Sequence, residues 1–594
     1  MNDHSKEHYA PEHPLLFDGA MGTVFAALPG RAGERCERAS LIHPDEISAI
    51  HRAYLKAGAR AIKTNTFSVG ADLAQGDDTL AEALIAAGCR LAKEAAEPYG
   101  AEVFADLGPI PRASGCDAGQ LFILQAEQFL KAGVTRFLAE TLSSDEGIPE
   151  LAAFLQGRCP DSFLIVSYAV GADGFTREGL SGRELLRRTA ALPGVDAVGF
   201  NCMSGPHHLL ACIRGLKLEG AMLSVMPNAG YPTVLGRRTA YQGKPDYFAQ
   251  QMIQILHAGA AIVGGCCGTT PDHIARLALL LREGAAPEPA PEPEAIPGPA
   301  VRAESDALWD KLRHGKKAVA VELDPPANDD ISSFLSGVGT LRDAGADVVT
   351  IADCPVGRPR ADSCLLACKI KRELGVETLP HLTCRDRNLN AIRALLLGLS
   401  IEDVHNILLV TGDPVPTESR DEVKSVFNFN SRKLARYVST LSADTLSTPF
   451  HIFGALNLNA RNFDVQLRLA KEKEEAGVQG FLTQPVLSAE ALENLKRARA
   501  ELNGKLFGGI FPVVSYRNAC FLNNEVSGIR VCDEIIDLYR DKGRDECEAI
   551  ALRVSSAIAG EIAPYVDGYY LMTPFQRVGL IARILQKMRE NGLV

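Results

Sequence analysis

A chain of 594 residues is too long for one hydrophobic core, so we expect at least two domains. The composition is 46% hydrophobic and 23% charged, without an apolar run of membrane length, which is typical of globular proteins. A formal net charge of -11 argues against nonspecific binding to nucleic acid or to anionic membranes. Residues 1–13 lack the apolar core of a secretory signal, and fifteen scattered cysteines fit a reducing compartment, so we expect a cytoplasmic location.

The first half of the chain alternates short apolar strands with helical stretches such as Pro44 to Gly58. The pattern predicts eight strands: Leu15 to Ala20, Ala61 to Phe67, Val103 to Gly108, Arg136 to Thr141, Phe163 to Val170, Ala197 to Cys202, Leu223 to Ala229 and Ala261 to Cys267. Eight β/α units in about 285 residues favour a TIM-type (β/α)8 barrel. A doubly wound open sheet is the alternative.

Polar and thiol side chains fall at the ends of these strands, where barrel enzymes carry their active sites. Asp18 ends the first strand and Glu140 the fourth, Cys202 ends the sixth, and Cys266 and Cys267 end the eighth. Three thiolates at two strand ends would make a soft zinc site with its fourth position open to a substrate. Each feature also has a structural interpretation: the cysteines as packed core residues, Asp18 as a turn former and Glu140 as a helix-terminal charge.

The helix expected after the two adjacent cysteines has a clear start signal. Gly264 and Gly265 allow close backbone approach, while Thr270 is a good N-cap and Pro271 a favoured first helical residue. Only a kinked turn can aim two adjacent thiols at one ion, so we expect one here.

Proline, alanine and glutamate dominate residues 285–300, which favours an extended polyproline II spacer. We therefore predict a first domain over residues 1–284, a linker over 285–300 and a second domain over 301–594.

The second half repeats the architecture and predicts a second TIM-type barrel. Its expected strands are Ala318 to Leu323, Asp347 to Asp353, Glu377 to Thr383, Asn406 to Gly412, His451 to Asn457, Gly480 to Pro485, Phe507 to Val514 and Gly568 to Pro574. The carboxyl ends of these strands again carry polar residues, namely Glu322, His381, Asp413 and Gln484. No Gly-x-Gly-x-x-Gly fingerprint follows a strand, so a Rossmann cofactor site is not indicated.

Four segments of the first half occur in an ordered set: Asp18-Gly-Ala-Met-Gly-Thr23, Glu140-Thr-Leu142, Gly199-Phe-Asn-Cys202 and Gly264-Gly-Cys-Cys-Gly-Thr269. Together they resemble the zinc-dependent homocysteine S-methyltransferase family. The resemblance implies Zn²⁺ bound by Cys202, Cys266 and Cys267 and homocysteine as substrate. It also implies that the substrate is bound by Asp18, Gly19, Glu140 and Asn201.

The second half resembles the methylenetetrahydrofolate reductase family over Ala307 to Phe575, on its strand ends and on Gly509-Ile-Phe-Pro-Val-Val-Ser-Tyr-Arg-Asn518. The resemblance implies FAD, NAD(P)H as co-substrate, and 5,10-methylene- and 5-methyltetrahydrofolate as substrate and product. Glu322 maps onto the family's proton donor, and we predict that burial raises its pKa. Asp413 would bind folate and cofactor, Gln484 and Tyr516 would bind the substrate, and His381 and Lys473 would bind the cofactor. A solvated helix lysine is the alternative for Lys473.

The sequence departs from better-known reductases at Glu322-Leu-Asp-Pro-Pro326, where those carry Phe-Phe between the acid and the prolines. Its second strand ends at Asp353, without the hydroxyl that some members place against the flavin. Both halves together resemble the bacterial bifunctional homocysteine S-methyltransferase/methylenetetrahydrofolate reductase family. The sequence does not decide whether the methyl donor is the folate, S-methylmethionine, S-adenosylmethionine or an external methyl-corrinoid protein. It also does not decide between NADH and NADPH, or whether the chain forms a homo-oligomer. A methyltransferase with one barrel in a regulatory or scaffold role is the alternative function.

Overall fold

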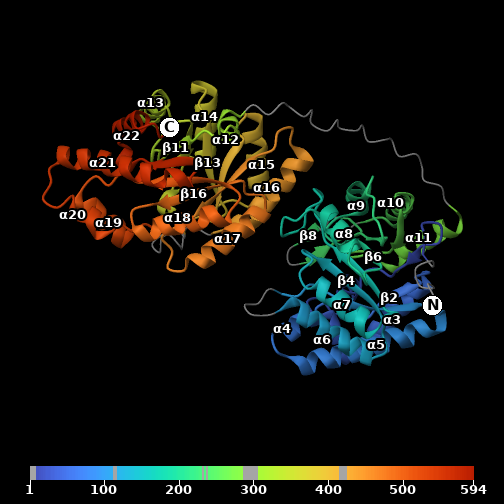
Figure 1. The fold of residues 1–594 in the computed structure, drawn as a ribbon. Helices are drawn as coiled ribbons and strands as arrows, with labels where there is room; N and C mark the ends of the chain where they lie inside the picture. Colours follow the sequence, from blue (N-terminus) through green and yellow to red (C-terminus); the bar gives the residue numbers. More distant parts are fainter. Residues whose placement is uncertain are drawn as a thin grey trace. The chain divides into compact units, whose positions relative to one another are not determined.

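The computed structural model describes residues 9–111, 117–230, 233–235, 238–241, 243–284, 306–413, 425–526 and 528–594. The chain divides into two compact units, residues 1–295 and 296–594 (Figure 1). The predicted linker 285–300 lies outside the described residues.

The first unit is built on eight parallel strands in the order β1-β10-β7-β6-β5-β4-β3-β2. Their bounds are β1 Leu15–Leu16, β2 Ala61–Lys63, β3 Glu102–Leu107, β4 Arg136–Leu142, β5 Phe163–Tyr168, β6 Ala197–Asn201, β7 Met222–Met226 and β10 Ala260–Val263. A parallel bridge between Phe17 and Ala61 joins the two edges, because Asp18 N donates to the Ala61 carbonyl at 2.9 Å. The predicted barrel is therefore confirmed, and the open-sheet alternative is wrong.

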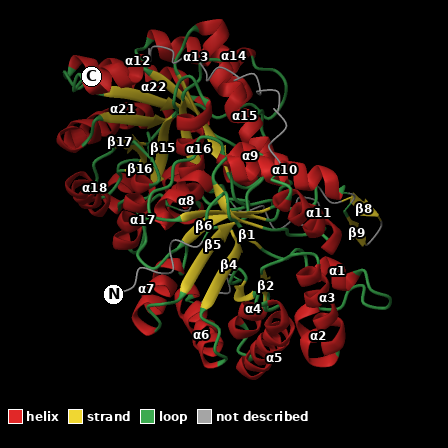
Figure 2. Ribbon diagram, turned by 90° about the vertical axis from the view of Figure 1, so that its right-hand side faces the viewer, coloured by secondary structure: helices red, strands yellow, loops and turns green. Residues whose placement is uncertain are grey.

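Helices surround this barrel on the outside (Figure 2). They are α1 Gly22–Ala26, α2 Cys36–Ile42, α3 Pro44–Lys56, α4 Val69–Ala74, α5 Asp78–Ala96, α6 Ala118–Lys131, α7 Ile148–Arg158, α8 Gly182–Ala190, α9 Pro206–Ile213, α10 Pro245–His257 and α11 Pro271–Arg282. Strands covered on both faces need mostly apolar residues, and every residue of β5 is buried, although Ser167 is polar. A short antiparallel hairpin of β8 (Thr233–Leu235) and β9 (Arg238–Ala240) also occurs, which the sequence pattern did not predict.

The second unit is a closed barrel of eight parallel strands that follow one another in sequence order, β11 to β18. Their bounds are β11 Ala318–Glu322, β12 Val348–Ile351, β13 Thr378–Thr383, β14 Asn406–Val410, β15 His451–Leu456, β16 Gly480–Pro485, β17 Lys505–Ile510 and β18 Gly568–Met572. The helices are α12 Ala307–Arg313, α13 Ser332–Asp343, α14 Ser363–Leu374, α15 Leu389–Ile401, α16 Ser431–Thr445, α17 Phe463–Glu475, α18 Ala489–Glu501, α19 Tyr516–Glu525, α20 Asp533–Asp537, α21 Arg544–Ile562 and α22 Val578–Glu590.

Helix α12 precedes the first strand of this barrel and packs against its interior core. Trp309 donates its indole N–H to Asn406 Oδ1 at 2.9 Å and stacks on His451 with ring centroids 4.4 Å apart. Asn406 and His451 are the first residues of β14 and β15, so α12 lies at the amino-terminal end of the barrel. The opposite, carboxyl-terminal end is left for function. None of the described helices is long and apolar enough to cross a membrane.

Candidate active sites

Three thiols meet at the carboxyl-terminal rim of the first barrel. Cys202 follows β6, and Cys266 and Cys267 follow β10, yet the three sulfur atoms lie within 4.8 Å of one another. The sulfurs of Cys202 and Cys267 are 3.7 Å apart. Tetrahedral zinc with bonds of about 2.3 Å needs sulfurs roughly 3.8 Å apart, so the three residues can share one ion.

A tight turn brings the sulfur atoms of the two adjacent cysteines to the same part of the rim. Gly265 N donates to the Asp18 carbonyl at 3.0 Å, and Cys266 N donates to the Pro227 carbonyl at 2.8 Å. A Cβ on Gly265 would lie 2.3 Å from Thr269 Oγ1, which shows why the turn needs glycine there. Thr270 caps α11 through a capping box, as the sequence predicted.

Cys202 is held in a backbone conformation that residues other than glycine seldom adopt. Its φ is 58°, and that of the next residue, Met203, is 55°. Thr141 at the end of β4 and Asn65 just after β2 also have positive φ, at 61° and 59°. Left-handed backbone at several strand ends of one rim costs free energy, and such strain is concentrated at functional sites.

Asn201, the last residue of β6, ties the thiols to the acidic part of the rim. Its buried Nδ2 donates to Glu140 Oε2 at 3.2 Å and to Thr141 Oγ1 at 2.8 Å, and it lies 3.9 Å from the Cys266 sulfur. Its Oδ1 accepts from Thr141 N at 2.8 Å. The amide therefore fixes both the carboxylate and the strand end beside the cysteines.

A buried lysine lies between the two predicted substrate-binding acids. Lys63 Nζ is 3.8 Å from Asp18 Oδ1 and 3.6 Å from Glu140 Oε2, and Asp18 Oδ2 accepts from Lys63 N at 3.1 Å. Burial raises the pKa of Asp18 to about 6, against the opposing effect of Lys63. Burial would lower the pKa of Lys63, but Glu140 and Asp18 outweigh it and raise that pKa. One cation thus partly neutralises two carboxylates.

Gly19 brings the Asp18 turn close to the turn that carries the cysteines. A Cβ there would lie 2.5 Å from Thr269 Oγ1 and 2.9 Å from the Tyr54 ring. The Tyr54 hydroxyl donates to the carbonyls of Ala20 and Thr269 at 2.8 and 3.0 Å. The close packing holds the Asp18 turn against the turn that carries the cysteines and leaves no room for a larger residue at 19.

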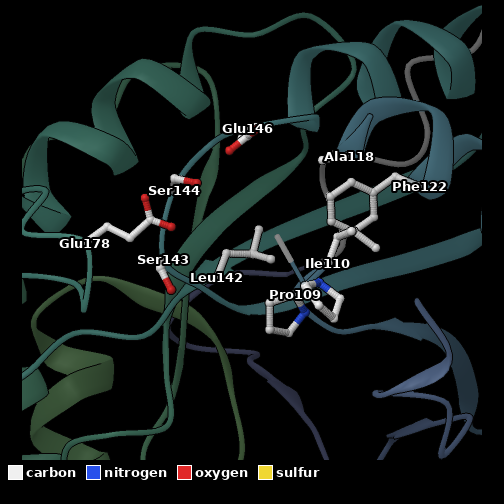
Figure 3. Close-up of a pocket in the computed structure, with 10 residues that line it drawn as sticks. Pro109, Ile110, Ala118, Phe122, Leu142, Ser143, Ser144, Glu146 and Glu178 are labelled. Carbon is white, nitrogen blue, oxygen red and sulfur yellow. The ribbon is translucent and has the colours of Figure 1, made fainter. Parts of the chain in front are cut away.

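A small cavity opens beyond β3 and β4 on the same side of this barrel (Figure 3). It measures about 80 Å³ and is lined by Pro109, Ile110, Phe122 and Leu142, with Ser143, Ser144, Glu146 and Glu178 at its polar edge. Pockets for organic ligands usually measure several hundred Å³. Among the described residues, this cavity is therefore smaller than a usual pocket for an organic ligand.

The mouth of the second barrel encloses a much larger cavity, of about 790 Å³. It is lined by residues from the ends of several strands, including the predicted Glu322, His381, Asp413 and Gln484. Its size suits a ligand with several rings. The structure thus brings four of the six predicted residues of this half to one space.

Glu322, the last residue of β11, lies in the floor of this cavity. Its Oε2 accepts a hydrogen bond from the Tyr570 hydroxyl of β18 and lies 3.7 Å from His381 Nε2. Burial, together with the charge of Asp324, raises the pKa of Glu322 to about 7, as the sequence analysis predicted in direction. Burial also lowers the pKa of His381 to about 4, so the imidazole is neutral and does not form an ion pair with Glu322.

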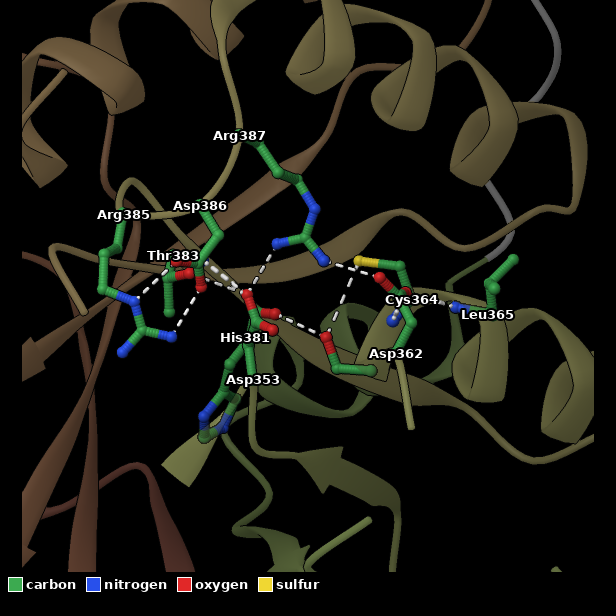
Figure 4. Close-up of polar contacts among 10 residues, drawn as sticks. Asp353, Asp362, Cys364, Leu365, His381, Thr383, Arg385, Asp386 and Arg387 are labelled. Atoms are coloured by element: carbon green, nitrogen blue, oxygen red, sulfur yellow. Dashed lines mark hydrogen bonds and ion pairs between the residues drawn. The ribbon is translucent and has the colours of Figure 1, made fainter. Parts of the chain in front are cut away.

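Asp353 takes part in a charge network at the end of β12, beside the cavity (Figure 4). Its Oδ2 accepts from Thr383 N and Oγ1 at 3.1 and 2.9 Å and from Arg387 at 2.8 Å. Burial would raise the pKa of Asp353, but Arg387 and Thr383 outweigh it and lower that pKa. Arg387 also donates to Asp362 at 2.5 Å, so it links the end of β12 to the start of α14.

Asp413 lies at the cavity edge and is exposed. Its main-chain carbonyl accepts a hydrogen bond from Arg385 at 2.7 Å. This bond fixes the backbone at Asp413, from which the exposed carboxylate projects.

Lys473 and Tyr516 are not among the residues that line this cavity. Lys473 donates from α17 to the Ala455 carbonyl of β15 at 2.8 Å, and burial, with Arg432, lowers its pKa to about 8. A solvated helix lysine is therefore the wrong description of it. Tyr516 begins α19, and the Arg540 guanidinium lies 5.1 Å from its ring centroid. Both cofactor and substrate roles for these two residues stay predictions.

Sequence reasoning missed Lys63, Tyr570 and Arg387. Lys63 ends an otherwise apolar strand, which was a usable signal, since a lysine there must find a buried partner. Tyr570 had no such signal, because Tyr569 precedes it and period-2 alternation does not say which of the two faces the interior.

Comparison with known families agrees with this division into two sites. Residues 15–281 match the model of the homocysteine S-methyltransferase family, and residues 308–588 match that of the methylenetetrahydrofolate reductase family. The matched ranges contain the cysteine rim and the large cavity, respectively.

Two relatives each match less than half of the chain. The proteins named methionine synthase from Mycobacterium tuberculosis and Mycobacterium leprae are each 31% identical, over 305 and 296 residues. These alignments cover 46% and 44% of this chain, and the chain spans about a quarter, 25% and 24%, of the length of these relatives. The metallated crystal structure of the homocysteine methyltransferase MmuM from Escherichia coli is 26% identical, with a TM-score of 0.37, and the match covers 45% of this chain and 96% of that one.

Proposed function

Because residues 15–281 belong to the homocysteine S-methyltransferase family and residues 308–588 to the methylenetetrahydrofolate reductase family, we propose that the chain is a bifunctional enzyme. Its first barrel transfers a methyl group to homocysteine and gives methionine. Its second barrel reduces 5,10-methylenetetrahydrofolate to 5-methyltetrahydrofolate with NAD(P)H. The observation that carries the first activity is the meeting of three sulfurs at one rim.

The cysteine rim fits a zinc ion. Three thiolates this close repel one another, so a divalent cation is the natural partner, and sulfur ligands select zinc among the common ones. Cys202, Cys266 and Cys267 would hold it. When bound, zinc lowers the pKa of a substrate thiol and keeps the resulting thiolate reactive.

The acidic part of the rim supplies substrate orientation. Asp18 and Glu140 hold the α-ammonium group of homocysteine, and Asn201 keeps Glu140 in place through its hydrogen bond of 3.2 Å. Lys63 balances one of the two negative charges, so one further cation, the substrate ammonium, balances the other. Fixing the ammonium fixes the sulfur of the same small molecule, and this positioning contributes to the rate by itself.

The large cavity of the second barrel fits FAD in size, and His381 Nε2 lies there buried without a hydrogen-bond partner among the described residues. We propose that it is held by His381 and Asp413, which line the cavity, and by Lys473, which lies outside the cavity lining. When bound, FAD passes a hydride from NAD(P)H to the folate.

Glu322 supplies the proton for folate reduction. The folate must open its ring to an iminium cation before it accepts a hydride, and the ring nitrogen must be protonated first. With a pKa of about 7, Glu322 is still substantially protonated at neutral pH, and Tyr570 holds its carboxyl group in place. Asp413 stabilises the cation, and Gln484 and Tyr516 bind the substrate.

The methyl donor is best identified by a screen. The purified chain is incubated with homocysteine and, separately, with 5-methyltetrahydrofolate, S-methylmethionine, S-adenosylmethionine or a methyl-corrinoid protein, and methionine is measured. A sulfonium donor should react faster than the folate, because the folate leaves as an amine that must be protonated. The Cys266→Ser variant is the matched control, and methionine formation by that variant at the wild-type rate would refute the assigned site.

The reductase activity has its own test. The full chain purified without denaturant should be yellow and should oxidise NAD(P)H when methylenetetrahydrofolate is added. Glu322→Gln should keep the flavin and its reduction by NAD(P)H but lose folate reduction. A colourless protein that binds no added FAD would exclude this half of the proposal.

A further inference from the structure

Phe575 is the most exposed aromatic side chain of the described residues, at 71%. It lies in the short 3-10 turn Pro574–Gln576, which follows the last strand of the second barrel. Its φ is 50° and that of Gln576 is 56°. Contacts of the Cβ atom disfavour two successive residues other than glycine in the left-handed region. Exposure of a large apolar ring to water is also unfavourable. Both disfavoured features occur in one turn.

The same turn borders the proposed folate site. Phe575, Pro574 and Gln576 line the cavity of about 790 Å³ that also contains Glu322 and Tyr570. Tyr570 donates to Glu322, and Phe575 is five residues farther along the chain, beyond the carboxyl end of β18. The strand ends at Met572, so Phe575 lies past its carboxyl end, and its exposure places it at the outer edge of the cavity.

The length of a folate molecule is compared with the positions of Glu322 inside the cavity and Phe575 at its edge. A folate is a pterin joined to a p-aminobenzoyl ring and a glutamate tail. If the pterin reaches Glu322, as the proposed function requires, the benzoyl ring extends toward the rim. An exposed aromatic ring at the rim suits stacking on a second aromatic ring, and burial against it removes the cost of exposure.

We propose that Phe575 binds the p-aminobenzoyl ring of the folate by stacking, and that the left-handed turn holds it there. This inference rests on the reductase activity proposed above. Backbone strain kept at a cavity edge is explained when the strained residue contacts the ligand. The flavin is a less suitable partner, because its reacting ring must approach the pterin in the inner part of the cavity.

Two substitutions at this position distinguish the effect of a flat aromatic ring from the effect of side-chain size. Phe575→Leu keeps an apolar side chain of similar size, whereas Phe575→Tyr keeps the flat ring. With the full FAD-loaded chain, we expect Phe575→Leu to raise the KM for methylenetetrahydrofolate about tenfold and Phe575→Tyr to leave it within twofold. Inhibition by p-aminobenzoylglutamate should weaken in the leucine variant by a similar factor.

Two control measurements would detect a general structural defect. They are the flavin content and the rate of NAD(P)H oxidation when a small quinone replaces folate as the electron acceptor. Both should equal the wild-type values in Phe575→Leu. An unchanged folate KM in that variant, or an equal rise in the tyrosine variant, would overturn the inference, as would a loss of flavin. If the wild-type chain itself does not reduce methylenetetrahydrofolate, the proposed function fails instead, so the two failures are distinguishable.

Discussion

Replacing Glu322 with glutamine should make the second unit more stable at alkaline pH while it removes folate reduction. The side chain of Glu322 is 21% exposed, and its pKa rises from the ordinary 4.5 to about 7 in the folded protein. A difference of this size corresponds to roughly 3 kcal/mol. The folded state disfavours the charged carboxylate, so the unfolded chain loses its proton first as the pH rises.

The pH dependence follows from the two pKa values. Below about pH 4.5 the carboxyl group is protonated in both states and has no effect on stability. Stability is then lost between about pH 4.5 and 7, and the full cost persists above pH 7. Glutamine is neutral at every pH and still accepts a bond from Tyr570. Glu322→Gln should therefore raise the free energy of unfolding by roughly 3 kcal/mol at pH 8 and by about 1 kcal/mol at pH 5.

Differential scanning calorimetry of the full chain measures this effect. The transition of the second unit is the one that moves when FAD is added, and its Tm should rise by about 6 °C at pH 8. Glu561→Gln, at an exposed position on α21, is the matched control and should leave both Tm values unchanged. A lower Tm for Glu322→Gln at pH 8, or the same increase at both pH values, would refute this account of the Glu322 pKa.

Three further predictions concern the first barrel. Lys63→Met should lower the free energy of unfolding of this unit by about 3 kcal/mol or more in calorimetry, because it leaves two buried carboxylates without their cation; adding Asp18→Asn should recover part of the loss. Gly265→Ala should reduce the zinc content, since its Cβ would lie 2.3 Å from Thr269 Oγ1, whereas Gly157→Ala, whose Cβ meets no atom within 4 Å, should keep the wild-type content. The KM for homocysteine should rise as the pH falls below about 6, where Asp18 gains a proton and no longer binds an ammonium ion; a constant KM between pH 8 and 5 would contradict this role.

The barrels were predictable because their strands follow a strong local rule. A strand covered on both faces, such as β10, is a nearly continuous apolar run, and the runs here alternate with helical stretches. The rim residues were then found by position alone, since every barrel strand ends on the same side. Asp18, Cys202 and Glu322 needed no knowledge of long-range contacts.

Pairing across the barrel was not predictable in this way. The ion pairs of Lys63 with Asp18 and Glu140 join β2 to residues at the ends of β1 and β4, and the bond from Tyr570 to Glu322 joins the last strand to the first. These contacts depend on barrel closure, which local periodicity does not encode. The partner of Lys473 is also nonlocal, because its ammonium reaches a main-chain carbonyl of β15 that has no sequence signature.

The central claim is that the three cysteines at one rim bind a zinc ion with one position open to homocysteine. Zinc K-edge X-ray absorption of the full chain, with and without homocysteine, tests it most directly. We predict one zinc per chain bound by three sulfurs at about 2.3 Å, and a fourth sulfur when homocysteine is added. Zinc retained at full occupancy in Cys266→Ser, or a sulfur count that homocysteine does not change, would contradict the claim.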